Sequence, residues 1–121
     1  MSYNKFLQIA RDQAKIGEAK GNALSGALII KDDKVLATSH DRRHQNNDPI
    51  ASAAMECIRL AGRRTDQSTL TLISTSYPDM LLAGTMLQFS IGTLVIGQPE
   101  TSSPAIDMLK SKEVSLHFHP K

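Results

Sequence analysis

The chain has 121 residues, 40% of them hydrophobic, and a formal net charge of +2 at pH 7. This length predicts a single domain over residues 1–121, and no apolar run approaches the length that crosses a membrane. One cysteine excludes an internal disulfide and a cysteine-rich zinc site, which favours a cytoplasmic protein. Few aromatic residues and no basic stripe argue against nucleic acid as the main partner.

The first part of the chain predicts a helix followed by a hairpin. Apolar residues recur at helical spacing over residues 3–20, and Gly21 and Asn22 end the pattern. Two short runs rich in β-branched and apolar residues then follow, separated by acidic turn residues. These predicted strands are residues 27–30 and 35–38, with the turn at 32–34 and a polar loop at 39–47.

Three later helices are predicted to begin at a proline. Asp48-Pro49, Ser76-Tyr77-Pro78 and Ser103-Pro104 each place a capping residue before a proline, whose missing N–H is not needed in the first helical turn. The predicted helices are residues 48–60, 76–89 and 103–110, and the strands that alternate with them are residues 69–74, 91–96 and 114–118.

The resulting order of elements, α-β-β-α-β-α-β-α-β, predicts an α/β protein. Alternation of strands and helices after the hairpin is typical of a mostly parallel sheet covered by helices on both faces. We therefore expect a three-layer α-β-α fold. Its five-stranded mixed sheet should have an antiparallel hairpin at its start and parallel pairing of its last two strands.

Several segments carry a family resemblance. Residues 48–59 read DPIASAAMECIR, and residues 71–85 read TLISTSYPDMLLAGT. These are similar to the motifs D-P-T-A-H-A-E-x-x-A-I-R and T-L-Y-x-T-x-E-P-C-x-M-C-x-G-A. Residues 26–30 and 91–97 resemble two strands of the same family. The chain resembles the cytidine deaminase-like superfamily, in the branch of tRNA adenosine, cytosine and guanine deaminases, over essentially its whole length.

The resemblance also shows which functional residues differ. The family's zinc-binding histidine falls on Ser52, and its proton-transferring glutamate falls on Ala54. The two cysteine ligands fall on Asp79 and Leu82, and the asparagine that contacts the base falls on Asp41. A catalytic zinc site needs three protein ligands and an open position for water. The resemblance therefore implies a divergent member without zinc or any other metal at this site.

Loss of zinc and glutamate removes the means of hydrolytic deamination. Zinc generates the attacking hydroxide, and general acid–base catalysis is worth about 10²–10⁴ in rate. We expect no catalytic residues and a pseudoenzyme that acts as a regulatory or scaffold subunit. The resemblance implies a homodimer, with a hetero-oligomer containing an active paralogue as the alternative. Its interface would use apolar residues around the two central helices, namely Met55, Leu60, Met80, Leu81, Met86, Leu87 and Phe89.

The same resemblance places two helix N-termini at one pocket, to which Ser76 and Pro78 also belong. In one interpretation, Ser52, Asp79 and Asp41 hold a small nucleobase-like ligand there. In the other, Asp79 only caps its own helix, Leu82 fills the space left by zinc, and no ligand binds.

An enzymatic alternative stays open. The chain would then be a deaminase-family hydrolase with altered chemistry, or Ser52 would act as a nucleophile with a base supplied by His40 or His44. The pairs His40–His44 and His117–His119 have spacings that a metal site can use, but such pairs are more often ordinary solvated side chains, and we expect no metal there. Cys57 lies on the apolar side of its helix, which predicts a buried structural thiol rather than a nucleophile.

Overall fold

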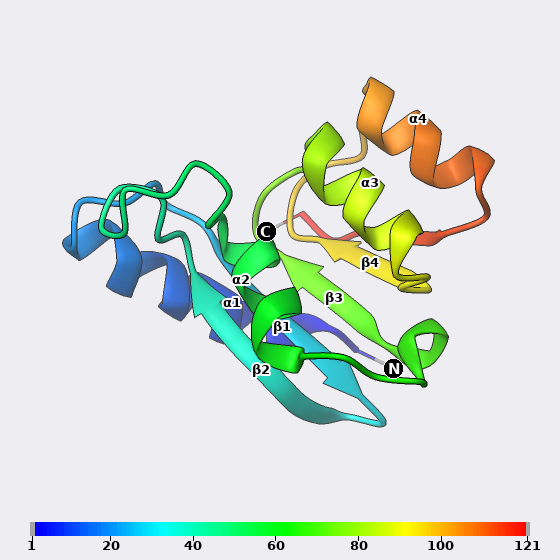
Figure 1. Cartoon of the computed structure of the whole chain (residues 1–121), viewed down its shortest axis with the longest axis horizontal. Coiled ribbons are helices and arrows are strands. Elements are labelled where there is room, and N and C mark those ends of the chain that lie inside the picture. Colours follow the sequence, from blue (N-terminus) through cyan, green and yellow to red (C-terminus); the bar gives the residue numbers. More distant parts are fainter. Residues whose placement is uncertain (1, 121) are drawn as a thin grey trace.

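A computed structural model describes residues 2–120, and Figure 1 shows its arrangement. The helices are α1 (Asn4–Ala19), α2 (Ala53–Ala61), α3 (Met80–Gln88) and α4 (Pro104–Ser111), with a short 3-10 helix η1 (Gln67–Thr69). The strands are β1 (Gly26–Lys31), β2 (Lys34–His40), β3 (Thr71–Ser74), β4 (Thr93–Ile96) and β5 (Ser115–Phe118). The order of elements predicted from the sequence is confirmed.

The five strands form one mixed sheet in the order β2-β1-β3-β4-β5. The antiparallel β1–β2 hairpin and the parallel β4–β5 pair are confirmed. The expectation of a mostly parallel sheet is wrong for the pairs that β1 makes, because β1 runs antiparallel to both β2 and β3, and the parallel pairs are β3–β4 and β4–β5. The helix between β2 and β3 keeps those two strands in one direction, but β1 lies between them in the sheet.

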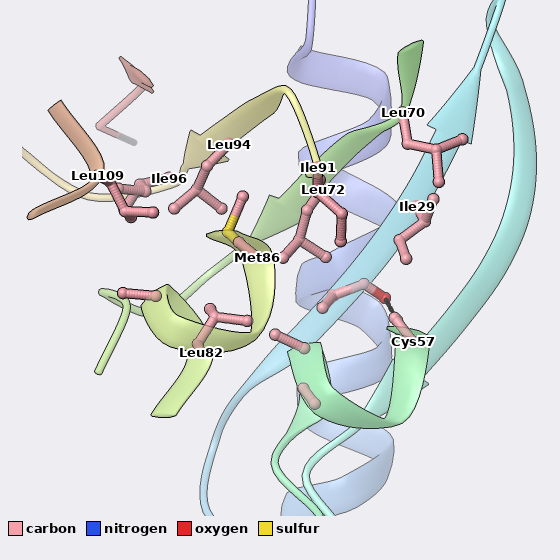
Figure 2. Close-up of a cluster of buried hydrophobic side chains, with 14 of the residues drawn as sticks. Ile29, Cys57, Leu70, Leu72, Leu82, Met86, Ile91, Leu94, Ile96 and Leu109 are labelled. Carbon is pink, nitrogen blue, oxygen red and sulfur yellow. Dashed lines mark hydrogen bonds between the residues drawn. The ribbon is translucent and has the colours of Figure 1, made fainter. Parts of the chain in front are cut away.

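Alternate residues of the strands supply the apolar interior on each face of the sheet. Leu28, Ile73 and Val95 face α1, where they pack with Phe6 and Leu7. Their neighbours along the strands face α2, α3 and α4, and Figure 2 shows this larger cluster. Its labelled members are Ile29, Cys57, Leu70, Leu72, Leu82, Met86, Ile91, Leu94, Ile96 and Leu109. Successive strand residues thus point to opposite faces, and both faces are apolar, as a sheet covered by helices on both sides requires. The three-layer architecture is confirmed.

Two local features fix how the first strands are placed. Asp32 and Asp33 both have positive φ, at 50° and 64°, which is the backbone of a tight two-residue hairpin turn. At the start of β1, a Cβ on Gly26 would overlap the carbonyl oxygen of Ala10. Only glycine therefore lets α1 approach the sheet this closely.

Two helix starts differ from the sequence prediction. Helix α2 begins at Ala53 rather than at Asp48, because the Asp48 carboxylate accepts the Ile50 N–H at 2.9 Å and closes a separate turn. Helix α3 begins at Met80, although Ser76-Tyr77-Pro78 was the predicted start. Helix α4 starts as predicted, with Pro104 as its first residue. None of the helices within residues 2–120 combines the length and apolar character that a membrane crossing requires.

Candidate functional site

A cavity of about 140 Å³ lies where α2 and α3 begin, next to the ends of β2 and β3. Most of the side chains singled out from the sequence line it: Asp41, Ser52, Ala54, Ser76, Asp79 and Leu82. Pro78 is buried between two lining residues but does not line the cavity itself. The fold therefore brings six of the seven candidate residues to one place, and their role there stays a prediction.

Ser52 and Asp79, which the resemblance aligns with zinc ligands, cap the helices that they begin. The Ser52 hydroxyl accepts the Met55 N–H at 3.4 Å, and the Asp79 carboxylate accepts the Leu82 N–H at 2.8 Å. Serine and aspartate are among the preferred N-cap residues because they accept these otherwise unpaired N–H groups. Leu82 itself is almost fully buried in the apolar cluster beneath α3.

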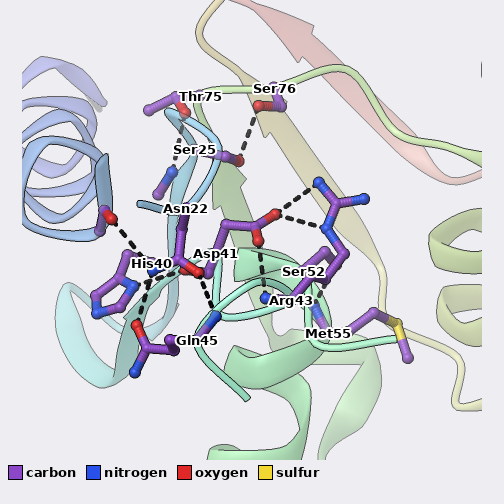
Figure 3. Close-up of polar contacts among 12 residues, drawn as sticks. Asn22, Ser25, His40, Asp41, Arg43, Gln45, Ser52, Met55, Thr75 and Ser76 are labelled. Atoms are coloured by element: carbon purple, nitrogen blue, oxygen red, sulfur yellow. Dashed lines mark hydrogen bonds and ion pairs between the residues drawn. The ribbon is translucent and has the colours of Figure 1, made fainter. Parts of the chain in front are cut away.

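Asp41 is held by a residue that the sequence reasoning did not select. Its carboxylate is buried and contacts Arg43 three times, at 3.0 Å to the backbone N, 2.8 Å to Nε and 2.6 Å to Nη2 (Figure 3). A carboxylate offers about four lone-pair positions, so little acceptor capacity is left for a ligand. The expectation that Asp41 contacts a ligand freely is weakened by this geometry.

Arg43 brings a fixed positive charge into the cavity. Its hydrogen bonds to Asp41, together with the negative charges of Asp41 and Asp79, raise the pKa of Arg43 above its ordinary value. Its side chain lines the cavity together with Asp79. The only sequence signal for this role was the Asp-x-Arg spacing in a polar loop, which is also common on solvated surfaces.

Tyr77, Ser25 and Ser74 also line the cavity and were not selected from the sequence. The hydroxyl of Ser76 donates to that of Ser25 at 2.8 Å, and the Ser74 hydroxyl bonds to the backbone of Ser76. The Ser76–Ser25 bond joins residues 51 positions apart, so no local sequence pattern could have indicated it.

The side chains at this place do not fit a zinc ion. Ser52 is neutral, Leu82 has no donor atom, and Asp79 is one carboxylate already engaged as a cap. Three nitrogen, sulfur or carboxylate ligands are the usual minimum for catalytic zinc. Within residues 2–120, no three histidine, cysteine, aspartate or glutamate side chains are grouped so as to hold a metal ion. The Arg43 guanidinium would also repel a divalent cation.

The histidines lie against α1 or at the sheet edge rather than beside Ser52. The buried His40 ring bonds through Nδ1 to the Asp41 carbonyl oxygen at 2.8 Å and packs so tightly on Gly17 that a Cβ there would lie 2.7 Å from it. His44 lies beside Gly21. No hydrogen bond joins either ring to Ser52 among the described residues, so the geometry supplies no base for a serine nucleophile. His117 and His119 share one side of β5, where both contact Tyr3.

Cys57 is fully buried and its thiol donates to the Ala27 carbonyl oxygen at 3.2 Å. Burial, reinforced by the charge of Glu56, raises the pKa of Cys57 to about 12. The thiolate is the reactive form of cysteine, so this side chain is inert at neutral pH. The prediction of a structural thiol agrees with this geometry.

Comparison with known proteins gives the family. The family model for the cytidine and deoxycytidylate deaminase zinc-binding region matches residues 1–98. The chain is 32% identical over 97 residues to a cytosine deaminase from Candida albicans, covering 78% of this chain and 65% of that protein. It is 33% identical over 70 residues to a tRNA-specific adenosine deaminase from Aquifex aeolicus, covering 58% of this chain and 46% of the relative.

The fold agrees with these relationships. A structure from a study of A-to-I editing by tRNA:A34 deaminases superposes with a TM-score of 0.83 at 20% identity, covering 96% of this chain and 92% of that one. The chain spans less than two thirds of the length of the relatives matched by sequence. From its match to the family over residues 1–98, the chain belongs to the zinc-binding cytidine and deoxycytidylate deaminase family.

Proposed function

We propose that this chain is a deaminase-family protein that has lost its zinc site and acts by binding rather than by hydrolysis. The observation that carries the proposal is the replacement of the reaction centre by two helix caps and an ion pair. Ser52 and Asp79 are engaged as caps, and Arg43 lines the cavity as a fixed cation. Ala54 stands at the position of the family's glutamate, and its methyl side chain cannot transfer a proton to a leaving amine.

The cavity supports a small ligand rather than a whole nucleoside. Its volume of about 140 Å³ is below the several hundred Å³ of ordinary small-molecule pockets. Arg43 offers N–H donors, and Asp79 retains acceptor capacity beyond its capping bond. A single nucleobase-like ring with a carbonyl acceptor and an amino donor fits this pair of groups. Without a ligand, the same residues serve only to stabilise the frame.

An apolar surface supports a partner subunit. Met55 and Ile58 of α2 and Phe89, the residue that follows α3, line a hollow of about 290 Å³. Leu60 of α2 and Met80 and Leu81 of α3 are exposed. We propose that this α2–α3 surface forms a homodimer, or pairs with an active paralogue. The buried free thiol fits the reducing cytoplasm, and one sheet carrying both apolar clusters supports one domain over residues 1–121.

Metal content and turnover test the proposal together. The purified protein, expressed with zinc in the medium, should contain far less than one zinc per chain by elemental analysis. Ammonia release from cytosine, cytidine, guanine and adenosine should stay at background. A stoichiometric zinc ion, or turnover above background, would show that the protein is a working hydrolase.

Ligand binding is tested separately, by thermal shift with a panel of free bases and nucleosides. Free bases should stabilise the protein more than the matching nucleosides do, because of the small cavity. An Arg43→Gln variant should lose the shift, and a control Arg63→Gln variant should keep it. If no base stabilises the protein, the ligand-binding part of the proposal is wrong, and only the scaffold role is left.

A further inference from the structure

A second and larger cavity is lined in part by α1. Helix α1 covers the face of the sheet opposite to α2 and α3 (Figure 1). Its volume of about 450 Å³ falls in the ordinary range for small-molecule pockets. One wall is α1, and the others are the segments that follow β3 and β4. Leu24 and Ser76 line both this cleft and the smaller cavity described above, so the two are neighbours.

Two positive charges face the cleft without a negative partner. Arg11 and Lys15 are four residues apart on α1, so their side chains lie on one face of the helix. Within the described residues neither makes an ion pair, and no acidic residue lines the cleft. Like charges at this spacing disfavour an isolated helix. This arrangement is thus unfavourable by itself and becomes favourable when an anion lies between the two cations.

The walls opposite these cations are held in place by hydrogen bonds. Gln98 donates to the Thr75 carbonyl oxygen at 2.9 Å, and the Tyr77 hydroxyl donates to the Pro99 carbonyl oxygen at 2.8 Å. Thr75 accepts the Gly26 N–H at 3.1 Å, so its own hydroxyl hydrogen is free to donate into the cleft. These residues follow the carboxyl ends of adjacent parallel strands, where open α/β sheets commonly bind ligands.

We propose that this cleft binds the phosphate group of a small phosphorylated molecule. A phosphomonoester carries a charge of about −1.5 to −2 at pH 7, which matches the two unpartnered cations better than a single carboxylate does. The Thr75 hydroxyl supplies a third donor. Ala14, Leu24 and Pro99 give the cleft an apolar part that accommodates the body of the ligand. This site does not depend on the proposed function, because Arg11, Lys15 and Thr75 do not line the smaller cavity.

The experiment follows backbone amide signals of the full chain by NMR during titration with inorganic phosphate, adenosine 5′-monophosphate and adenosine. Shifts should be saturable with the two phosphate compounds and should map to Arg11, Thr75 and Gln98. The monophosphate should bind more tightly than inorganic phosphate, because only it uses the apolar part, and adenosine should bind more weakly than the monophosphate. The Arg11→Gln/Lys15→Gln variant should weaken phosphate binding by about tenfold or more, since charged hydrogen bonds are lost.

The matched control is Lys34→Gln/Lys110→Gln, which removes the same charge from exposed positions on the hairpin and on α4. Its affinity should stay within about twofold of the wild type, as expected for exposed charges beyond the screening length. If both variants lose the same affinity for phosphate, the effect comes from net charge alone, and the proposal is overturned. Absence of saturable binding by both phosphate compounds, or shifts confined to the loop around Asp41, would overturn it as well.

Discussion

At the scale of single residues, Ser52 and Asp79 cap the helices that they begin. Ser52 and Asp79 stand where the family has its histidine and first cysteine, and both accept an N–H of the first helical turn. The N-terminus of a helix carries a partial positive charge, which zinc ligands or a capping oxygen can each offset. Serine and aspartate at these two positions are thus compatible with a stable fold.

Removal of these caps should be measurable as a loss of stability. Asp79→Ala is expected to lower the free energy of unfolding by about 1–2 kcal/mol, and Ser52→Ala by less, because its hydrogen bond is longer. Denaturant unfolding measures both. The matched control is Ser103→Ala, which removes the cap of α4. There the Ser103 hydroxyl accepts the Ile106 N–H at 3.1 Å, and Ser103 does not line the cavity. An unchanged or higher stability of Asp79→Ala would show that this carboxylate is kept for binding and not as a cap.

The Cys57 thiol predicts a particular loss of stability at high pH. Its pKa is raised to about 12 in the folded protein, whereas an unfolded thiol ionises near pH 9. Between these values the unfolded chain has released a proton that the folded protein still holds, so stability falls as pH rises, by up to about 1.4 kcal/mol per pH unit. A Cys57→Ser variant retains a hydroxyl donor for Ala27 without titrating in this range. Unfolding free energies at pH 8 and pH 10 should therefore diverge between the two proteins, and parallel curves would contradict the assignment.

At the scale of the elements, helix α3 presents apolar residues on two sides. Leu82, Ala83 and Met86 pack into the interior, while Met80 and Leu81 remain about half exposed. One buried side is enough to hold a helix on a sheet. The second side, together with neighbouring residues of α2, is the α2–α3 surface proposed above for a partner subunit.

The double variant Met80→Ser/Phe89→Ser tests that surface. Both side chains are exposed in the single chain, so the substitutions should leave its stability nearly unchanged. Light scattering should give twice the mass of one chain for the wild type and the mass of one chain for the variant. Ile16→Ser/Val35→Ser removes two equally exposed apolar side chains elsewhere and should leave the dimer intact. A monomeric wild type would rule out the homodimer.

At the scale of the whole molecule, the frame of the family is retained. The sheet order, the three layers and the placement of two helix N-termini at one cavity all persist. The frame depends on apolar packing over both faces of the sheet, whereas the centre depends on a few polar side chains. A change in those polar side chains therefore need not disturb the apolar frame.

If the frame is intact, zinc binding should be recoverable by substitution. The variant Ser52→His/Ala54→Glu/Asp79→Cys/Leu82→Cys rebuilds the motifs H-x-E and P-C-x-x-C on the starts of α2 and α3. It should bind about one zinc per chain, measured by elemental analysis and by a rise in melting temperature with added zinc. The control variant with Ser52→His alone should not. Removal of Arg43 in addition should increase the affinity, because a fixed positive charge then leaves the site. A folded variant without zinc would show that the backbone has also moved from the family geometry.

The sequence by itself determined the order of the elements, the alternation that buries both faces of the sheet, the family, and the absence of zinc-ligand side chains at Ser52 and Leu82. These properties are written in local patterns, such as the period of apolar residues or the spacing of a motif. It misplaced the starts of α2 and α3, because Asp48 closes its own turn and Ser52 is the better-placed cap.

Only the tertiary structure decided that Arg43 holds Asp41, that β1 lies between β2 and β3, and that Arg11 and Lys15 face the segments after β3 and β4. Each of these depends on contacts between residues far apart in the chain or on which lone pairs and charges remain free after folding. A local pattern contains neither kind of information, since burial and hydrogen-bond partners are established only when the layers pack together.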